Sequence, residues 1–505
     1  MNFKNLTDVP GVQEVYGDDS INVSTIATHS AQASPNSLFV ALPGTTTDGH
    51  AFLPDAYRAG ARAFVTQKPF RMPGVANLVV ADTRAALAAL AARFYDYPSE
   101  RLRLIGITGT NGKTTTAFLT ESILCAAGFQ TGLISTIAYR YGSGCRAADR
   151  TTPDQLRLQS LFRDMADAGT QYVVMEVSSH GLQQRRVDGC SFDVAVFTNL
   201  TPEHLDYHGT MDEYFKAKER FFTEVLPASK KQRTIAIVNR DDPYGAALLS
   251  RVKTPALTYG MSEADVHVEH AQISLQGIRA EIATPQALVS IQSPLIGRFN
   301  LMNILAAVAV ATACGIPPDA IPQGIARLTG VPGRMERIEN TKGLSVFVDY
   351  AHTGDALEQV LATLTQAGAQ RIITVFGCGG DRDRAKRPVM GSVAARYSAV
   401  VILTSDNPRS EDPEAIISEI EPGVLQQGYT RTTAKRLTPE SSRCYALVPD
   451  RRAAIRTALA SARAGDVVLI AGKGHETYQE VRGIRTHFDD RDVAREALAD
   501  SFASL

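Results

Sequence analysis

The chain has 505 residues and almost no net charge, with 52 Lys and Arg against 53 Asp and Glu. This balance gives no support to a nucleic-acid or membrane-surface partner, since such proteins usually carry a marked basic excess. Its apolar content of 44% is that of an ordinary globular protein, and the chain is longer than one hydrophobic core supports. We therefore expect about three domains.

Six cysteines are scattered along the chain without the paired spacing of a zinc site or a disulfide framework. The first residues lack the apolar core of a signal peptide. The longest apolar run, 304–314, is too short for a bilayer span, which needs about 20 residues. These features predict a protein of the reducing cytoplasm that does not insert into membranes.

Residues 1–98 alternate short apolar runs with helical patterns, which predicts a small α/β domain. The predicted strands are 37–42, 63–66 and 78–80, and the predicted helices are 54–59 and 84–94. The segment Tyr97-Pro98-Ser99 follows the last helix. We place the first domain boundary there.

A glycine-rich stretch, Gly106 to Thr115, lies between an apolar strand pattern and a helical pattern. Its backbone N–H groups and the following helix N-terminus suit a phosphate, Lys113 adds a positive charge, and the Thr114 hydroxyl suits Mg²⁺. Only the distal Gly-Lys-Thr half has the usual spacing, because Ile107 stands where the first glycine is expected. The alternative is a glycine-rich turn without a ligand, but the strand and helix on either side favour phosphate binding.

Strand patterns then recur at 172–177, 194–198 and 235–239 with helical patterns between them, which predicts a doubly wound parallel sheet. Ligands bind at the carboxyl ends of such strands, where Glu176 and His180 fall. A carboxylate and an imidazole such as Glu176 and His204 are able to hold a divalent cation beside phosphate oxygens. The alternative for His204 is a hydrogen-bonded loop residue.

A β-meander pattern at 266–292 and the apolar helix at 304–314 complete this part of the chain. After Arg334 a second α/β rhythm begins, with predicted strands at 345–349, 371–376, 400–404 and 466–471. Three charged loop residues of this part are able to bind an amino acid, because arginine matches a carboxylate and glutamate an ammonium group. These residues are Arg382, Arg409 and Glu476. The alternative, three unrelated surface ion pairs, stays open.

Several motifs together resemble the Mur ligase family. They are Thr108-Gly109-Thr110-Asn111-Gly112-Lys113-Thr114-Thr115, Glu176-Val177-Ser178-Ser179-His180-Gly181, the segment from Asn199 to Gly209, Gly333-Arg334-Met335-Glu336 and Asp349-Tyr350-Ala351-His352-Thr353. The resemblance implies a three-domain α/β enzyme: a small N-terminal α/β domain, a central phosphate-loop domain with a doubly wound, mainly parallel sheet, and a C-terminal Rossmann-like α/β domain. It implies that residues 1–98 bind a UDP substrate, 99–334 bind ATP and 335–505 bind an amino acid.

The resemblance also implies the reaction. In this family ATP phosphorylates a substrate carboxylate, and an amino acid then attacks the acyl phosphate to form an amide, with Mg²⁺ spreading charge during phosphoryl transfer. The motif Asp406-Asn407-Pro408-Arg409 is similar to that of members that add meso-diaminopimelate to UDP-N-acetylmuramoyl-L-alanyl-D-glutamate. Such an enzyme acts in peptidoglycan synthesis in the cytoplasm, is commonly a monomer, and has no nucleic-acid partner.

Site residues follow from the matching motif positions. The residues involved in catalysis would be Lys113, Glu176, His204 and a carbamylated Lys218. The metal ligands would be Thr114, Glu176, His204 and Lys218. ATP would contact Gly109, Thr110, Asn111, Gly112, Lys113, Thr114, Thr115, Asn300, Asn303, Arg334, Asp349 and His352. The UDP substrate would contact Ser30, Thr151, Thr152, Ser178, Gln184 and Arg186. Diaminopimelate would contact Arg382, Asp406, Asn407, Arg409, Gly472 and Glu476.

Side-chain chemistry alone does not separate Lys218 from its neighbour Lys216, since most helix lysines are solvated. Two positions depart from the family pattern: His29-Ser30-Ala31 replaces Asp-Ser-Arg, and His352-Thr353-Gly354 replaces His-Thr-Pro. The alternatives to the proposed ligase are a lysine-adding or folylpolyglutamate-forming ligase and a nucleotide-switched binding protein without turnover. The complete Asp406–Arg409 motif disfavours the lysine-adding enzyme, and the N-terminal domain disfavours the folylpolyglutamate enzyme.

Overall fold

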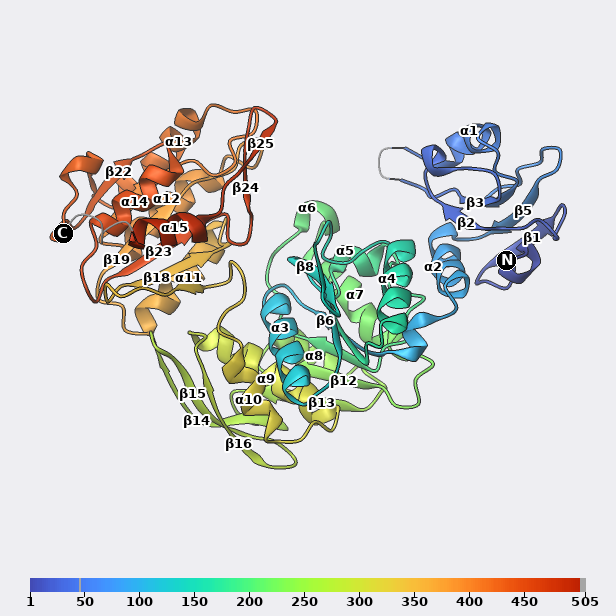
Figure 1. Ribbon diagram of the computed structural model, residues 1–505, viewed down its shortest axis with the longest axis horizontal. Coiled ribbons are helices and arrows are strands. Elements are labelled where there is room, and N and C mark those ends of the chain that lie inside the picture. The colour runs from blue at the N-terminus through green and yellow to red at the C-terminus, as the bar shows by residue number, and fades with distance from the viewer. Residues whose placement is uncertain (45–46, 500–505) are drawn as a thin grey trace. The chain divides into compact units, whose positions relative to one another are not determined.

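The computed structural model describes residues 1–44 and 47–499 (Figure 1). The chain divides into two compact units. The first comprises residues 1–267, 283–287 and 303–324, and the second comprises 268–282, 288–302 and the chain from 325 onward. Residues 500–505, which the sequence assigns to the third domain, lie outside the described residues, and the boundaries at 98 and 334 stay predictions.

The N-terminal part of the first unit is a five-stranded sheet in the order β1-β5-β4-β3-β2. Its strands are β1 (Val12–Tyr16), β2 (Thr25–Ala27), β3 (Ser37–Val40), β4 (Ala63–Thr66) and β5 (Ala76–Val80), of which only β1 is antiparallel to its neighbour. The helices α1 (Leu53–Arg58) and α2 (Thr83–Phe94) connect and follow these strands. The strands and helices predicted between residues 37 and 94 are therefore confirmed.

The part of the central sheet that lies in the first unit has the order β13-β12-β11-β6-β10-β7-β8-β9, and Val266 and His267 pair in parallel with its β13 edge. Its strands are β6 (Arg103–Thr108), β7 (Thr131–Ile134), β8 (Ala138–Tyr141), β9 (Gly144–Ala147), β10 (Tyr172–Glu176), β11 (Val194–Phe197), β12 (Ile235–Asn239) and β13 (Ala256–Gly260). Pairing is parallel from β13 to β7, and every residue of β10 and β11 is buried. Burial on both faces explains why these strands appear in the sequence as unbroken apolar runs. The antiparallel hairpin β8–β9 is an addition that the sequence did not reveal.

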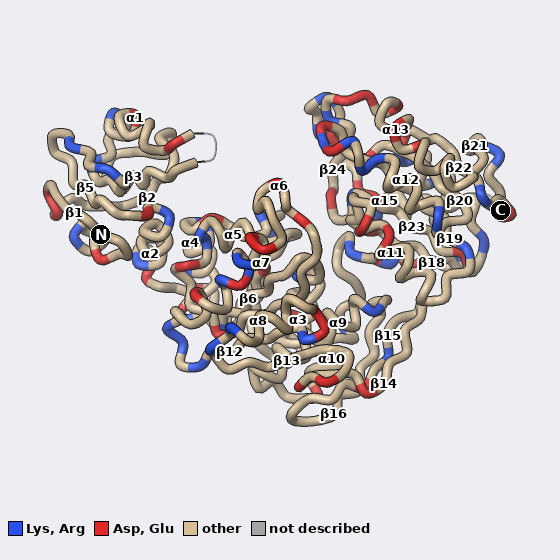
Figure 2. Tube along the Cα trace, turned by 180° about the vertical axis from the view of Figure 1, so that it is seen from behind, with Lys and Arg blue, Asp and Glu red and all other residues tan. Residues whose placement is uncertain are grey.

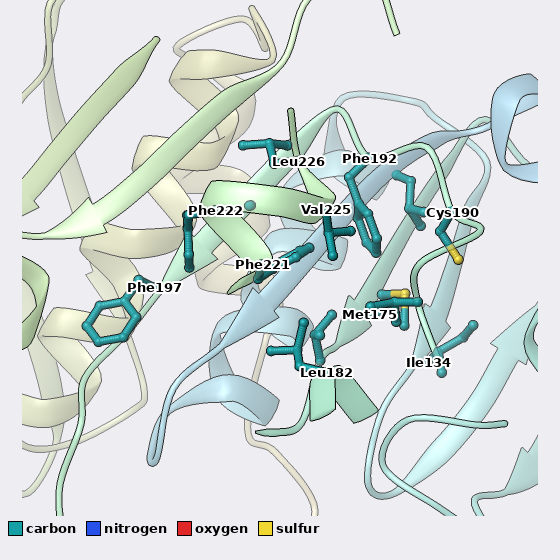
Figure 3. Close-up of a cluster of buried hydrophobic side chains, with 14 of the residues drawn as sticks. Ile134, Met175, Leu182, Cys190, Phe192, Phe197, Phe221, Phe222, Val225 and Leu226 are labelled. Carbon is teal, nitrogen blue, oxygen red and sulfur yellow. The ribbon is translucent and has the colours of Figure 1, made fainter. Parts of the chain in front are cut away.

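Helices pack against this sheet, and together they form a hydrophobic core. They are α3 (Lys113–Ala126), α4 (Gln155–Asp167), α5 (Ser179–Gln183), α6 (Leu205–His208), α7 (Met211–Arg220) and α8 (Pro243–Leu249). Helix α7 continues into a π-helical turn, Phe221–Val225, which directs Phe221 into the core beside Phe192 and Phe222 beside Phe197 (Figure 3). This turn anchors the end of α7, and with it the position of Lys218.

The second unit contains a seven-stranded sheet in the order β17-β18-β23-β19-β20-β22-β21. Its strands are β17 (Glu336–Ile338), β18 (Ser345–Asp349), β19 (Ile372–Phe376), β20 (Val400–Leu403), β21 (Thr430–Thr432), β22 (Cys444–Leu447) and β23 (Val467–Ala471). One face packs against α11 (Gly354–Gln366), α12 (Lys386–Tyr397) and α13 (Pro413–Gln426), and the other against α14 (Arg451–Ala460) and α15 (Asp490–Ala499). The four strands predicted for this part are confirmed.

Smaller elements complete the chain. The predicted meander is formed by β14 (Val266–Ser274), β15 (Gly277–Ala283) and β16 (Leu288–Ser293), and the apolar helix is α9 (Arg298–Ala313), followed by α10 (Ala320–Arg327). An antiparallel hairpin, β24 (Tyr478–Val481) and β25 (Ile484–His487), was not predicted.

Acidic and basic residues are interspersed along the trace (Figure 2). None of the helices described here is both long and apolar enough to cross a bilayer.

Candidate active site

The glycine-rich loop joins β6 to α3, as the phosphate-loop prediction requires. The residues that follow β11 hold the loop in place: Asn199 accepts hydrogen bonds from the backbone N–H groups of Thr110 and Asn111, each at 2.9 Å. The Thr110 hydroxyl lies 3.1 Å from the Tyr214 hydroxyl of α7. The loop is thus fixed by two other elements before any ligand binds.

Two glycines of the loop have no room for a side chain. A Cβ on Gly109 would lie 1.8 Å from Thr198 Oγ1, and one on Gly112 would lie 2.3 Å from Asn303 Oδ1. Both glycines also have positive φ, 150° and 86°. Such conformations strain residues with a side chain, so these positions require glycine. The loop therefore uses its glycines at 109 and 112, and the missing first glycine of the usual spacing is not needed.

Two lysines converge on this loop. Lys113 Nζ donates to the Gly109 and Thr110 carbonyls at 2.8 and 2.6 Å, and Lys218 Nζ donates to the same Gly109 carbonyl at 2.8 Å. Lys218 is 1% exposed and lies over the Tyr214 ring. Burial, followed by the positive charge of Lys113, holds the pKa of Lys218 well below its usual range. Lys216, in contrast, is exposed and pairs with Glu213, so burial separates two lysines that the sequence does not distinguish.

Glu176 ends β10 as a fully buried carboxylate. One oxygen accepts a hydrogen bond from the Thr136 backbone N–H at 2.9 Å, and the other accepts from the Thr136 hydroxyl at 3.2 Å. Thr136 is a partner that sequence reasoning missed, because it lies in the connection between β7 and β8 without a motif of its own.

Three histidines gather beside α7. The His204 ring stands edge-on to His180, with centroids 4.9 Å apart, and His180 lies 5.5 Å from His208. His208 Nε2 is 3.0 Å from Ser179 Oγ, and burial lowers the pKa of His208 to about 4. His204 itself is exposed, with a left-handed φ of 56°. Of these three, the sequence singled out only His204 as a site residue.

The donor set proposed for Mg²⁺ combines a carboxylate, a hydroxyl and an imidazole. Among residues 1–44 and 47–499 no group of three or more His, Cys, Asp and Glu side chains is arranged to hold a metal. Mg²⁺ keeps several waters and uses substrate phosphates, so it needs few protein ligands. Within the same described residues Glu176 has no ion-pair partner, and a buried unpaired carboxylate is one that a cation would neutralise. The buried Glu176 carboxylate therefore fits Mg²⁺, and the other proposed ligands stay predictions.

Five of the six residues predicted for the UDP substrate lie together around Glu176. Thr151 Oγ1 is 3.1 Å from Thr136 Oγ1, and Thr152 Oγ1 donates to the Glu176 backbone carbonyl at 2.9 Å. Arg186 donates to the Thr152 carbonyl at 2.6 Å and to Gln184 Oε1 at 2.7 Å. Ser178 completes the group, because its backbone N–H donates to Thr152 Oγ1 at 2.9 Å.

The remaining UDP-substrate candidate, Ser30, begins the short 3-10 helix Ser30–Gln32, which precedes β3 in the N-terminal part of the first unit.

The candidates for nucleotide binding are divided between the two units. Asn303 belongs to the first unit, where its Oδ1 accepts from Thr116 Oγ1 at 3.3 Å. The second unit carries Asn300, Arg334, Asp349 and His352.

Within the second unit, two of these nucleotide candidates lie beside the Tyr350 ring. The Arg334 guanidinium lies 5.1 Å from the Tyr350 ring centre, and the His352 ring lies 4.7 Å from it. Asp349 is buried and accepts from the backbone N–H groups of Met335 and Ala351, each at 2.7 Å. Burial raises the pKa of Asp349. Asn300 Nδ2 donates to the Ile296 carbonyl at 2.9 Å.

The residues predicted for the amino acid meet at the carboxyl ends of β20 and β23. Asn407 Nδ2 donates to Glu476 Oε2 at 2.8 Å, and Asp406 packs against Gly472, where a Cβ would lie 2.9 Å from Asp406 Oδ2. A Cβ on Gly379 would lie 3.0 Å from an Arg409 nitrogen and 3.8 Å from Arg382 Cγ. Arg382 and Arg409 therefore both lie near Gly379, and Glu476 contacts Asn407; their joint binding of an amino acid stays a prediction.

The hairpin β24–β25 holds the loop that carries Arg409. The Arg409 N–H donates to the Glu480 carbonyl at 3.0 Å, and the Arg482 N–H donates to the Arg409 carbonyl at 2.6 Å. Arg409 has a left-handed φ of 52°, and its guanidinium donates to the Gly380 carbonyl at 2.6 Å. These backbone contacts fix a conformation that is strained for an arginine.

Three segments of the chain match domains of one family. Residues 22–95 match the Mur ligase family catalytic domain, 107–311 the Mur ligase middle domain, and 333–474 the glutamate ligase domain of Mur ligases. The chain is also 48% identical, over 99% of both chains, to UDP-N-acetylmuramoyl-L-alanyl-D-glutamate–2,6-diaminopimelate ligase of Geobacter metallireducens. The chain belongs to the Mur ligase family.

Two further comparisons agree. A ligase of the same name from Geobacillus thermodenitrificans is 43% identical over 98% of both chains. A solved structure of a UDP-N-acetylmuramoyl-L-alanyl-D-glutamate–2,6-diaminopimelate ligase matches with a TM-score of 0.72 and 32% identity over 99% of both chains. The predicted family, the three-domain α/β fold class and the enzyme class, a ligase, are confirmed. The individual site residues stay predictions.

This Mur ligase also has a buried site residue that sequence reasoning missed. Lys473 is 0% exposed, and its Nζ donates to Asn407 Oδ1 at 3.0 Å. Its position could have pointed to it, because Lys473 lies between the predicted site residues Gly472 and Glu476, just after the predicted strand 466–471. Its chemistry alone gave no reason to select it over other lysines.

Proposed function

We propose that this Mur ligase joins meso-diaminopimelate to the D-glutamate of UDP-N-acetylmuramoyl-L-alanyl-D-glutamate, with ATP as the second substrate, in peptidoglycan precursor synthesis. The observation that carries the proposal is the convergence of Arg409, Asn407 and Glu476 at one end of the C-terminal sheet. Arginine suits a carboxylate and glutamate an ammonium group, so the cluster suits an amino acid. The names of the two related ligases from Geobacter metallireducens and Geobacillus thermodenitrificans support the same substrates.

We assign the binding of the UDP substrate, ATP and the amino acid to residues 1–98, 99–334 and 335–505 respectively. The proposal includes action in the cytoplasm as a monomer without a nucleic-acid partner. It also includes every site residue predicted from the family motifs, with Mg²⁺ held by Thr114, Glu176, His204 and Lys218.

In the proposed reaction the D-glutamate carboxylate takes the γ-phosphoryl group of ATP, leaving ADP. The amine of diaminopimelate then attacks the acyl carbon and loses a proton, and the C–O bond to phosphate breaks to leave an amide. Lys113 and the loop N–H groups bind the phosphates, while Arg186 and Thr152 position the UDP substrate. Bound Mg²⁺ supplies charge neutralisation during phosphoryl transfer.

The burial of Lys218 supports its proposed carbamylation. Carbamate formation needs a neutral amine that attacks CO₂, and the depressed pKa of Lys218 provides one. Two lysines that donate to one carbonyl also repel each other when both are charged. A carbamate on Lys218 would replace that repulsion by attraction to Lys113 and add an anionic oxygen ligand for Mg²⁺.

The proposal is tested by incubating the enzyme with the UDP-muramoyl dipeptide, ATP, Mg²⁺ and either diaminopimelate or L-lysine. We expect phosphate release with diaminopimelate and at least about tenfold less with lysine, which leaves Arg409 facing no anion. Phosphate release with lysine alone would contradict the substrate, and ATP binding without ADP release with any amino acid would contradict the reaction.

The matched variants are Arg409→Ala and Arg431→Ala. Arg431 is a surface arginine of β21 that contacts Glu421, so its loss leaves the site intact. We expect Arg409→Ala to lower kcat/KM for diaminopimelate by about 10- to 100-fold and Arg431→Ala to leave it unchanged. Equal activity of the two variants would remove the proposed role of Arg409.

A further inference from the structure

Lys473 lies at the centre of the amino-acid cluster without a role in the proposed reaction. Its side chain is completely buried, and its Nζ lies 3.0 Å from Asn407 Oδ1, 3.4 Å from Glu476 Oε2 and 3.6 Å from Asp406 Oδ1. The Tyr478 ring of β24 covers the ammonium group at 5.5 Å. A lysine is rarely fully buried unless it is paired, and here three oxygens surround its charge.

The contact with Lys473 fixes which way the Asn407 amide faces. Asn407 Oδ1 accepts from two donors, Lys473 Nζ and the Glu480 backbone N–H, each at 3.0 Å. An amide nitrogen in that place would meet two donors and accept neither. The Asn407 Nδ2 group is therefore held toward Glu476, to which it donates at 2.8 Å.

Lys473 also sets the charge of the cluster. Asp406 and Glu476 contribute two carboxylates and Lys473 contributes one ammonium, so this triad, counted apart from the guanidinium groups of Arg382 and Arg409, carries one negative charge. Asp406 Oδ1 is buried without a hydrogen-bond partner, so the Lys473 ammonium is its compensating charge at 3.6 Å. A triad with one net negative charge is matched by one ammonium group of an incoming amino acid.

We propose that Lys473 is a positioning residue that orients Asn407 and Glu476 and leaves its triad with Asp406 and Glu476 one negative charge for an ammonium group of the amino acid. This inference rests on the proposed function of the same site. It assigns Lys473 no contact with the substrate and no part in phosphoryl transfer.

The test compares Lys473→Met with the wild type in the complete ligase assay. Methionine keeps the length of the side chain and removes the charge and the hydrogen bonds. We expect KM for diaminopimelate to rise about 10- to 100-fold, while KM for ATP stays within about twofold. A purely structural role would lower stability without this difference between the two KM values.

A second variant separates charge from packing. In Lys473→Met/Asp406→Asn the three side chains at positions 406, 473 and 476 again carry one negative charge, so we expect KM for diaminopimelate to recover at least about threefold relative to Lys473→Met. If the double variant is no better than Lys473→Met, the charge argument is overturned. If KM for diaminopimelate is unchanged in Lys473→Met itself, the whole inference is overturned.

The matched control is Arg371→Met. Arg371 forms a buried ion pair with Asp466 at the amino ends of β19 and β23, the opposite end of the sheet from the cluster. We expect this variant to lower the thermal unfolding midpoint and to leave KM for diaminopimelate unchanged. A rise in KM equal to that of Lys473→Met would mean that any loss of a buried cation in this sheet disturbs the site, and would overturn the inference.

Calorimetric binding of diaminopimelate to the full chain separates this inference from the proposed function. If the wild type binds diaminopimelate but does not turn it over, the proposed reaction fails, and the Kd values of the wild type and the Lys473 variants still decide the role of Lys473. If the wild type does not bind diaminopimelate, the proposed substrate and this inference both fail.

Discussion

Lys113 and Lys218 donate hydrogen bonds to the same backbone carbonyl, that of Gly109, each at 2.8 Å. One lysine begins the helix after the phosphate loop, and the other lies more than a hundred residues later in α7. The structure thereby ties the residue proposed to bind phosphate to the residue proposed to carry a carbamate. The first prediction follows from this contact.

We expect Lys218→Ala to lower kcat by about 10²- to 10³-fold, because the variant loses an anion that would orient the metal and the reacting phosphate. Short carboxylic acids such as acetate should restore part of the activity by occupying the space of the carbamate. Lys216→Ala is the matched control, since Lys216 is an exposed lysine of the same helix. A density map without extra atoms on Lys218 Nζ, together with no rescue of the variant, would contradict the carbamate.

We expect Gly109→Ala to impair ATP binding, because its Cβ would collide with Thr198 Oγ1 and shift the loop. KM for ATP should rise at least about tenfold. Gly128 is the control: it also has positive φ, 88°, just after the same helix, but a Cβ there meets nothing within 4 Å. Gly128→Ala should cost about 1 kcal/mol of stability and leave KM for ATP unchanged. Equal KM values for the two variants would contradict a tightly fitted loop.

We expect Arg451→Met to lower the free energy of unfolding by about 3–5 kcal/mol, because it leaves the fully buried Asp490 without a partner. Arg451 also donates to the carbonyls of Ser405 and Ala471, the residues just before Asp406 and Gly472. Urea unfolding of Arg451→Met and of the double variant Arg451→Met/Asp490→Leu measures the effect. The double variant should be the more stable of the two, and the reverse order would contradict the cost of the unpaired carboxylate.

His208 predicts a pH dependence of stability. Burial lowers its pKa from 6.5 to about 4, so between these values the unfolded chain binds a proton that the folded chain does not. The stability from neutral His208 is therefore complete above about pH 6.5 and is lost as the pH falls to about 4, by roughly 1–3 kcal/mol.

The variant His208→Gln keeps a hydrogen-bonding group near Ser179 and removes the titration. Thermal unfolding of both proteins at about pH 7 and about pH 5 measures the difference. The wild type should lose more stability than the variant on acidification. Identical losses in the two proteins would show that other groups carry the acid sensitivity.

The sequence by itself determined the main buried strands of both α/β parts, the phosphate loop and the family motifs. These features are local: the loop occupies ten consecutive residues between a strand and a helix, and buried parallel strands such as β10 are unbroken apolar runs. It also placed Asp349 and Glu176 correctly at strand ends, because parallel strands end where their apolar runs end. The β24–β25 hairpin was not predicted, since its two short strands lack an apolar run.

Only the tertiary structure decided which polar side chains are buried and what they contact. Lys216 and Lys218 are two residues apart in one helix and so face opposite sides of it, and the structure shows that the side of Lys218, which it shares with Tyr214, is the buried one. Glu176 contacts Thr136 across the sheet, and Lys473 meets Asn407 from another strand end. Such contacts join residues that are tens of positions apart, so the hydrophobic periodicity of the sequence does not predict them. The packing of the elements alone determines them.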